Sequence, residues 1–192
     1  MKTKQILLCM LLACFVIPSL AQNRWGIMGG GLLSKSTAKD SYFRAGGYVG
    51  GLYDIKVKDC FFIQPQLLFT YEEFRTNRPK LISSNNNFYS KYSMELPLLA
   101  SFSVRVNQKV NFRFNAGPYV SYTFFGRDGG DSGLGWWHQD FWNHFTYGVK
   151  GGVALETKHF FYTIDCKYSL DKNLFFQNGH GLTLSGGMGY KF

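Results

Sequence analysis

Apolar and polar residues alternate along long segments of this chain. In the segment 61–74, FFIQPQLLFTYEEF, one parity carries Phe61, Ile63, Pro65, Leu67, Phe69 and Tyr71. The other parity carries Gln64, Gln66, Thr70 and Glu72. A period of two with one apolar and one polar face indicates a β-strand between two environments. The pattern recurs and predicts eight strands, at 24–34, 42–57, 61–74, 88–104, 110–124, 142–156, 159–170 and 181–192.

The connections between these segments differ in length in a regular way. Those after the second, fourth and sixth segments are short, around Lys58, Asn107 and Lys158, whereas those after the third and fifth are long and polar. Short turns at one end and longer loops at the other are typical of an outer-membrane barrel. We therefore predict an all-β fold, an eight-stranded antiparallel up-and-down transmembrane β-barrel. Both termini are expected on the periplasmic side, with the short turns.

A soluble lipocalin-like barrel or a β-sandwich would also show alternating strands. In those folds the outward parity is solvated and should be rich in Lys and Glu. Here the polar parity is rich in glycine and neutral residues, and its opposite charges can pair inside a narrow lumen. Aromatic residues also gather near the predicted strand ends, as in the two interfacial girdles of a membrane barrel. The pattern therefore favours the membrane barrel.

The last segment, GLTLSGGMGYKF, alternates up to a final aromatic residue. Because lipid tolerates no free strand edge, we expect this strand to close the barrel against the first one. Its ending, with Gly187, Tyr190 and Phe192, resembles the C-terminal assembly signal of outer-membrane barrels. That resemblance implies the barrel assembly machinery as a partner.

Residues 1–21 have the pattern of a secretory signal peptide, with two lysines, an apolar run and a small-x-small site that ends at Ala21. We expect cleavage after Ala21 and a barrel domain at 22–192. The competing interpretation is a lipoprotein box at 11–14, with Cys14 acylated. The full sequence has a formal net charge of +9, and loss of Lys2 and Lys4 with the signal peptide leaves +7. An exported chain of this charge meets lipopolysaccharide phosphates or anionic surfaces first. We therefore expect outer-membrane lipid and lipopolysaccharide as partners, and no nucleic acid.

Several segments together resemble the PorT-like outer-membrane β-barrel family of Gram-negative bacteria. They are 26–32 (GIMGGGL), 50–53 (GGLY), 62–68 (FIQPQLL), 94–99 (MELPLL), 116–120 (AGPYV) and 189–192 (GYKF). One departure is Gln66, where the family commonly shows Glu. The resemblance implies the barrel fold, the outer membrane of a Gram-negative bacterium and a link to protein secretion across that membrane.

The polar parity of the strands defines a set of residues that should face the lumen. It comprises Arg44, Asp54, Gln66, Glu95, Arg113, Lys150, Asp165 and Lys167. Buried charges must be paired, and an eight-stranded lumen is only wide enough for side chains. We therefore predict a structural polar network, with Glu95 paired to Arg113 and Asp165 to Lys150. The rival interpretation is a small polar pore.

Catalytic and metal-binding patterns are weak. Lipid A-modifying barrel enzymes use a Ser and a His with a carboxylate, so His144 with Ser121 or Asp140 is one candidate. No nucleophile motif surrounds it, and we predict no enzyme and no cofactor. Asp128, Asp131 and Asp140 could hold Ca²⁺, but Asp-Gly loops are ordinary turns, and we predict no metal. Cys60 and Cys166 fall on opposite parities, and we predict no disulfide.

The long loops carry the remaining candidate surface. Arg75, Arg78 and Lys80 follow the third predicted strand, and Trp136 and Trp137 follow the fifth. Basic and aromatic residues of this kind engage partners. We therefore predict a binding or scaffolding protein with an unknown protein or glycan partner. A small-solute pore or a lipid A-modifying enzyme is the alternative.

Overall fold

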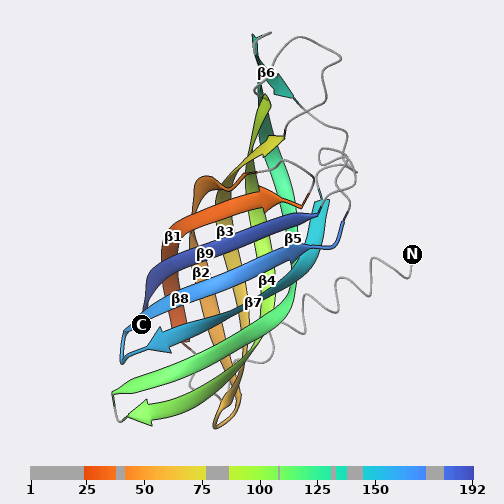
Figure 1. Ribbon diagram of the computed structural model, residues 1–192. Helices are drawn as coiled ribbons and strands as arrows, with labels where there is room; N and C mark the ends of the chain where they lie inside the picture. Colours follow the sequence, from red (N-terminus) through yellow and green to blue (C-terminus); the bar gives the residue numbers. More distant parts are fainter. Residues whose placement is uncertain are drawn as a thin grey trace, which may run out of the picture.

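The computed structural model describes residues 24–37, 42–76, 87–107, 109–130, 133–137, 145–171 and 180–192. Eight antiparallel strands form one closed barrel (Figure 1), which confirms the predicted fold class. They are β1 (Arg24–Ser36), β2 (Arg44–Lys58), β3 (Phe61–Thr76), β4 (Asn87–Asn107), β5 (Val110–Gly130), β7 (Phe145–Glu156), β8 (Phe160–Ser169) and β9 (Gly181–Lys191). A short ninth strand, β6 (Gly133–Trp137), lies beyond the barrel wall. In the part of the chain described, no helix is long and apolar enough to cross a membrane.

Pairing of the first and last strands closes the barrel. β1 and β9 run antiparallel, from Gly26 opposite Lys191 to Ser36 opposite Gly181. The pairing continues past the strand end, where the amide of Phe192 donates to the carbonyl oxygen of Trp25 at 2.8 Å. Since β9 also pairs with β8, and β1 with β2, both closing strands have backbone partners on both sides. The predicted closure of the last strand against the first is confirmed.

The three short connections lie at the same end of the barrel, here called the turn end. They join β2 to β3, β4 to β5 and β7 to β8. The longer connections lie at the opposite end, here called the loop end. There β3, β4 and β5 extend above the rest of the wall, and β6 lies beyond them (Figure 1).

One prediction about the loop end is wrong. The segment after Phe124 was expected to be a loop, but β5 continues to Gly130 and β6 pairs with it, from Gly126 opposite Trp137 to Gly130 opposite Gly133. The sequence of this hairpin shows no alternation of apolar and polar residues. Strand pairing uses backbone groups, so it can form without that alternation. Arg75 likewise lies within β3, opposite Phe88, and not in the loop.

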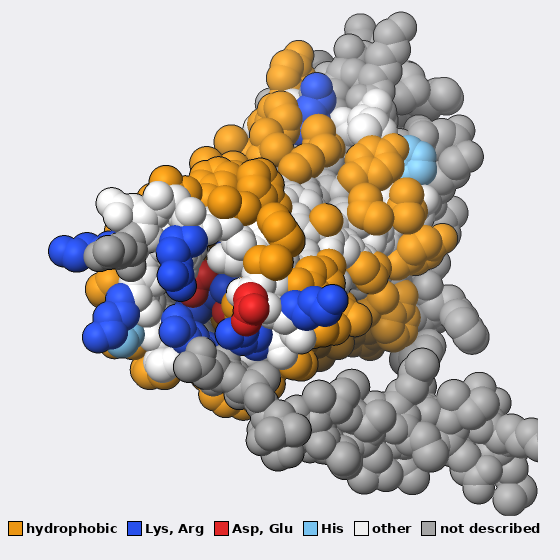
Figure 2. Space-filling view, turned by 90° about the horizontal axis from the view of Figure 1, so that it is seen from below, with side chains coloured by type: hydrophobic (Ala, Val, Ile, Leu, Met, Phe, Trp, Pro, Cys, Tyr) orange, Lys and Arg blue, Asp and Glu red, His pale blue; other side chains and the backbone are white. Residues whose placement is uncertain are grey.

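The two parities of each strand have opposite environments. Apolar side chains on the outward parity are exposed, such as Ile164 at 68% and Met188 at 62%. Polar side chains on the inward parity are buried, such as Glu72 at 1% and Asp54 at 1%. Figure 2 shows the resulting apolar outer surface around a charged opening at the turn end. A soluble barrel would have the opposite distribution, so this arrangement suits a wall surrounded by lipid.

Aromatic pairs mark both ends of the apolar surface. At the turn end, the Trp25 and Tyr53 ring centroids are 4.6 Å apart, and the Tyr190 and Phe192 centroids are 5.2 Å apart. Toward the loop end, Tyr71 pairs with Tyr92, with centroids 4.9 Å apart. Two aromatic belts of this kind fit the two interfaces of a bilayer.

Candidate functional site

The loop-end half of the interior holds four charged side chains, here called the upper cluster: Glu72, Lys91, Glu95 and Lys167. The Nζ of Lys167 lies 2.8 Å from Oε1 of Glu72 and 2.6 Å from Oε2 of Glu95. The Nζ of Lys91 lies 2.9 Å from Oε2 of Glu72. The hydroxyl of Thr183 also donates to Oε1 of Glu72, at 3.2 Å. The upper cluster thus joins β3, β4, β8 and β9 across the lumen.

A chain of polar contacts runs through the middle of the lumen. The Nζ of Lys150 lies 3.8 Å from Oδ2 of Asp165 and donates to Oε1 of Gln66 at 3.1 Å. Gln66 donates in turn to Gln64 at 2.9 Å, and Gln64 donates to Asp54 at 2.6 Å. The predicted pairing of Asp165 with Lys150 is therefore confirmed. Gln66, which stands where the PorT-like family commonly shows Glu, serves here as a neutral hydrogen-bonding link.

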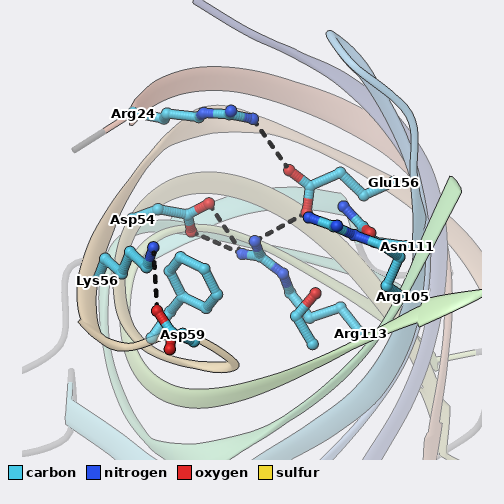
Figure 3. A pocket seen from close by; sticks show the side chains of 10 residues that line it. Arg24, Asp54, Lys56, Asp59, Arg105, Asn111, Arg113 and Glu156 are labelled. Carbon is cyan, nitrogen blue, oxygen red and sulfur yellow. Dashed lines mark hydrogen bonds and ion pairs between the residues drawn. The ribbon is translucent and has the colours of Figure 1, made fainter. Parts of the chain in front are cut away.

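A second cluster of four charged side chains lies nearer the turn end, here called the lower cluster: Asp54, Arg113, Glu156 and Lys191. Nη1 of Arg113 donates to both carboxylate oxygens of Asp54, at 2.9 and 2.8 Å, and its Nη2 lies 2.8 Å from Glu156. The Nζ of Lys191 lies 2.6 Å from Asp54 and 3.2 Å from Glu156. Figure 3 shows Arg113 between the two carboxylates. Phe62 stacks on Arg113, with the guanidinium carbon 4.6 Å from the ring centroid.

The ion-paired charges of the described interior balance. Five acidic side chains, Asp54, Glu72, Glu95, Glu156 and Asp165, face five basic ones, Lys91, Arg113, Lys150, Lys167 and Lys191. Burying a charge is costly unless an opposite charge and further hydrogen bonds accompany it. This ion-paired network therefore carries no net charge. Asp171, whose carboxylate oxygens are also buried, lies near Lys91 and Thr146 outside these pairs.

The predicted pair of Glu95 with Arg113 is wrong. In the β4–β5 register, Glu95 lies opposite Ser121, whereas Arg113 lies opposite Ser103. Eight residues of strand separate these two positions, which is about 26 Å at the usual rise per residue. Glu95 therefore belongs to the upper cluster and Arg113 to the lower cluster.

Arg44 does not join the interior network either. It lies at the loop end of β2, and its Nη1 is 3.8 Å from Oε2 of Glu73, with the Arg44 side chain 38% exposed. Conversely, the predicted set omits Glu72, Lys91, Glu156 and Lys191, which supply half of the two clusters. Their parity could have found them, because each shares a strand face with other polar inward residues.

The turn end of the lumen opens into a cavity of about 190 Å³, here called the turn-end pocket. Its lining consists of Arg24, Asp54, Lys56, Asp59, Phe62, Ser103, Arg105, Asn111, Arg113 and Glu156. Basic side chains surround its opening (Figure 2), and Asp54, Arg113 and Glu156 of the lower cluster form its floor (Figure 3). A second cavity, higher in the lumen and lined by Glu95, Lys150 and Lys167 among others, measures only about 10 Å³. It has room for about one water molecule.

Several predicted candidates fall outside the described part of the chain. These are the signal peptide at 1–21, and Arg78, Lys80, Asp131, His138, Asp140 and His144. The side chains of Arg75, Asp128, Trp136 and Trp137 are not described either. Ser121, the candidate nucleophile, is buried in the barrel at 4% exposure. The thiols of Cys60 and Cys166 are both free.

The two described histidines contact backbone carbonyls and aromatic rings. Nδ1 of His159 lies 3.3 Å from the carbonyl oxygen of Lys191, and its ring stacks on Tyr190. Nδ1 of His180 lies 3.1 Å from the carbonyl oxygen of Ser169, and its ring lies near Tyr168. Within the described residues, no group of three or more His, Cys, Asp or Glu side chains could hold a metal ion.

Comparison with protein families agrees with the barrel fold described above. Residues 20–174 match the family model of the outer membrane protein beta-barrel domain. The chain belongs to this family. It is therefore a small outer-membrane β-barrel, and the match does not distinguish the PorT-like subgroup within the family. Comparison with curated proteins found no match.

Solved structures of bacterial outer-membrane proteins resemble this barrel. OprG of Pseudomonas aeruginosa is 12% identical, with a TM-score of 0.52 over 92% of this chain and 99% of that chain. Neisserial surface protein A is 14% identical, with a TM-score of 0.51 over 88% of this chain and 97% of that chain. The attachment invasion locus protein Ail of Yersinia pestis is 12% identical, with a TM-score of 0.46 over 88% of this chain and 99% of that chain. At such identities, the likeness to OprG and to the Neisserial protein shows the fold alone.

Proposed function

We propose that this outer-membrane barrel is a non-enzymatic, non-conducting protein of the PorT-like type. In this proposal the barrel binds a protein or glycan partner through extracellular loops at the loop end. The turns and both termini face the periplasm. The observation that carries the proposal is the lumen, where five acidic and five basic side chains pair across the barrel.

The pairing of these charges disfavours a pore. A conducting lumen needs a continuous water path, but between the turn-end pocket and the small upper cavity lie Asp54, Arg113 and the chain of Gln64 and Gln66. Each of these side chains is at most 6% exposed. Eight-stranded barrels generally have interiors that side chains fill.

The described histidines also give little support to an enzyme. A nucleophile of the Ser type needs a base within hydrogen-bonding reach, and that base needs an orienting group. His159 and His180 contact backbone carbonyls instead. The loops at the rim of the barrel are then the candidate binding surface, since loops on a rigid scaffold often carry binding residues.

Planar-bilayer recordings test the closed lumen. We expect the purified, refolded barrel to give no stable channels of uniform conductance, with a known porin in the same bilayer as the positive control. Stable open channels would refute the plugged barrel. Lipid A of altered acylation in cells that overproduce the protein would instead support the enzyme alternative.

The loop proposal and its link to secretion need a test in cells. A strain without this gene should release fewer secreted proteins, and the wild-type gene should restore them. We expect a variant with Arg75, Arg78 and Lys80 changed to Gln and Trp136 and Trp137 changed to Ala to reach the membrane but fail to restore secretion. Lys109→Gln, at the turn end, is the matched control and should restore it. Full restoration by the loop variant would contradict the proposal.

A further inference from the structure

The turn-end pocket is bordered by the last inward-facing residues of several strands. Arg24, Lys56 and Arg105 occupy these positions on β1, β2 and β4, and Asn111 and Glu156 occupy them on β5 and β7. The parity that places charged residues in the lumen therefore places three cations around its opening (Figure 3).

These three cations have weak partners or none. Nη1 of Arg24 lies 3.9 Å from Glu156, and Nζ of Lys56 lies 3.7 Å from Asp59, whose side chain is fully exposed. Among the described residues, no carboxylate lies within ion-pair distance of Arg105. These pairs are long and the Arg24 side chain is 47% exposed, so the three cations can turn toward a ligand at little cost.

The floor of the pocket contains a buried guanidinium group. Arg113 is 4% exposed, and its two terminal nitrogens bind Asp54 and Glu156. Its Nε, however, has no hydrogen-bond acceptor among the described residues. This nitrogen is sealed from solvent, so Arg113 contributes to the floor of the pocket the positive charge of its guanidinium.

The charge of the pocket matches a phosphate group. Its lining and the adjacent Lys191 comprise five bases (Arg24, Lys56, Arg105, Arg113 and Lys191) and three acids (Asp54, Asp59 and Glu156). The excess is two positive charges, and a phosphate monoester carries about −1.5 to −2 at neutral pH. Guanidinium groups also match the geometry of phosphate oxygens.

The size of the pocket sets an upper limit on the ligand. Its volume of about 190 Å³ is smaller than the roughly 300–1,000 Å³ of a typical drug-sized site. It corresponds to about six water molecules at roughly 30 Å³ each. We propose that the turn-end pocket binds a small phosphate-bearing ligand, of the size of a phosphorylated three-carbon unit. The ligand is either a free solute or the headgroup of a lipid.

Calorimetric titration with sn-glycerol 3-phosphate tests the site, with the full barrel in a neutral detergent. We expect saturable binding with one site per barrel that weakens as salt rises, because charge attraction drives it. Arg105→Gln should weaken binding by about tenfold, since charge-assisted hydrogen bonds are the strong ones. Lys109→Gln is the matched control, because Lys109 is an exposed turn-end cation outside the pocket lining. A gel shift without heating verifies that both variants are folded.

The same titration in nanodiscs identifies the source of the phosphate. If a lipid headgroup fills the pocket, nanodiscs with phosphatidylglycerol should bind glycerol 3-phosphate more weakly than nanodiscs of phosphatidylcholine alone. Equal affinity in both supports a free solute. Absence of saturable binding at millimolar concentration would overturn the proposal. An equal loss in Arg105→Gln and Lys109→Gln would also overturn it, because diffuse surface charge would then explain the binding. None of these outcomes bears on the loop-binding proposal.

Discussion

Two neighbouring glycines of β9 face opposite sides of the barrel wall. A Cβ on Gly187 would meet the Tyr48 hydroxyl, and it would lie 2.7 Å from the carbonyl oxygen of Gly29. A Cβ on Gly186 would meet no atom closer than the Thr163 carbonyl oxygen, at 3.9 Å. Tyr48 is 8% exposed and packs into the lumen beside Gly187. The inward glycine thus leaves room for an aromatic ring, which gives Gly187 a steric role besides the predicted assembly signal.

We expect Gly187→Ala to lower the free energy of unfolding by about 1–3 kcal/mol, the usual cost of overpacking. Gly186→Ala is the matched control and should leave stability nearly unchanged, because its Cβ has free space. Urea unfolding in lipid vesicles measures both. Equal stability of the two variants would show that Tyr48 moves aside without cost.

At the scale of the element, the end of β9 places one residue, Lys191, inside the barrel and the next, Phe192, on its outer surface. Lys191 points into the lower cluster, and Phe192 is 69% exposed beside Tyr190 at the turn end. The backbone continues the pairing with β1 through the amide of Phe192. The end of the closing strand is thus held by ion pairs inside and by an aromatic girdle outside.

We expect Phe192→Asp to reduce the folded fraction in the membrane by roughly half or more, because a carboxylate replaces an interfacial aromatic residue. Lys109→Asp, at the turn between β4 and β5, is the control and should assemble normally. Comparison of heated and unheated samples on a detergent gel reports the folded fraction. Normal levels of folded Phe192→Asp would show that this aromatic side chain is incidental to assembly.

At the scale of the whole molecule, the interior network joins strands that are distant in sequence. Lys167 on β8 binds Glu72 on β3 and Glu95 on β4, and Lys191 on β9 binds Asp54 on β2. These ion pairs cross the lumen, whereas the backbone pairs run around the wall. The backbone pairs thus form the wall of the barrel, and the ion pairs link opposite sides of that wall through its interior.

We expect Lys167→Met to lower the free energy of unfolding by about 3–5 kcal/mol, because the buried Glu95 carboxylate loses its ion-pair partner and Glu72 keeps only Lys91. The double variant with Glu95→Gln should recover part of that loss, since one orphaned charge disappears. Arg44→Gln is the control and should cost less than about 1 kcal/mol, because its pair with Glu73 is half-exposed. Equal losses in Lys167→Met and Arg44→Gln would contradict a structural role for the upper cluster.

The sequence by itself determined which face of each strand meets lipid. Period two follows from the geometry of a single strand, so Ile164 and Asp165 could be assigned to opposite faces without knowledge of any neighbour. The count of barrel strands and the short turns followed from the same pattern. The pairing of Lys150 with Asp165 was also within reach, because the two residues lie on adjacent strands joined by a short turn.

Only the tertiary structure decided which side chains meet across the lumen. Glu95 contacts Lys167 and not Arg113, because the contact depends on the register and stagger of every strand around the closed wall. Alternation carries no information about that stagger, since a shift of two residues preserves parity and moves each side chain to a new height. The turn-end pocket arises in the same way. Arg24, Lys56 and Arg105 are far apart in the chain, and they meet around one opening because closure brings the ends of their strands to one rim.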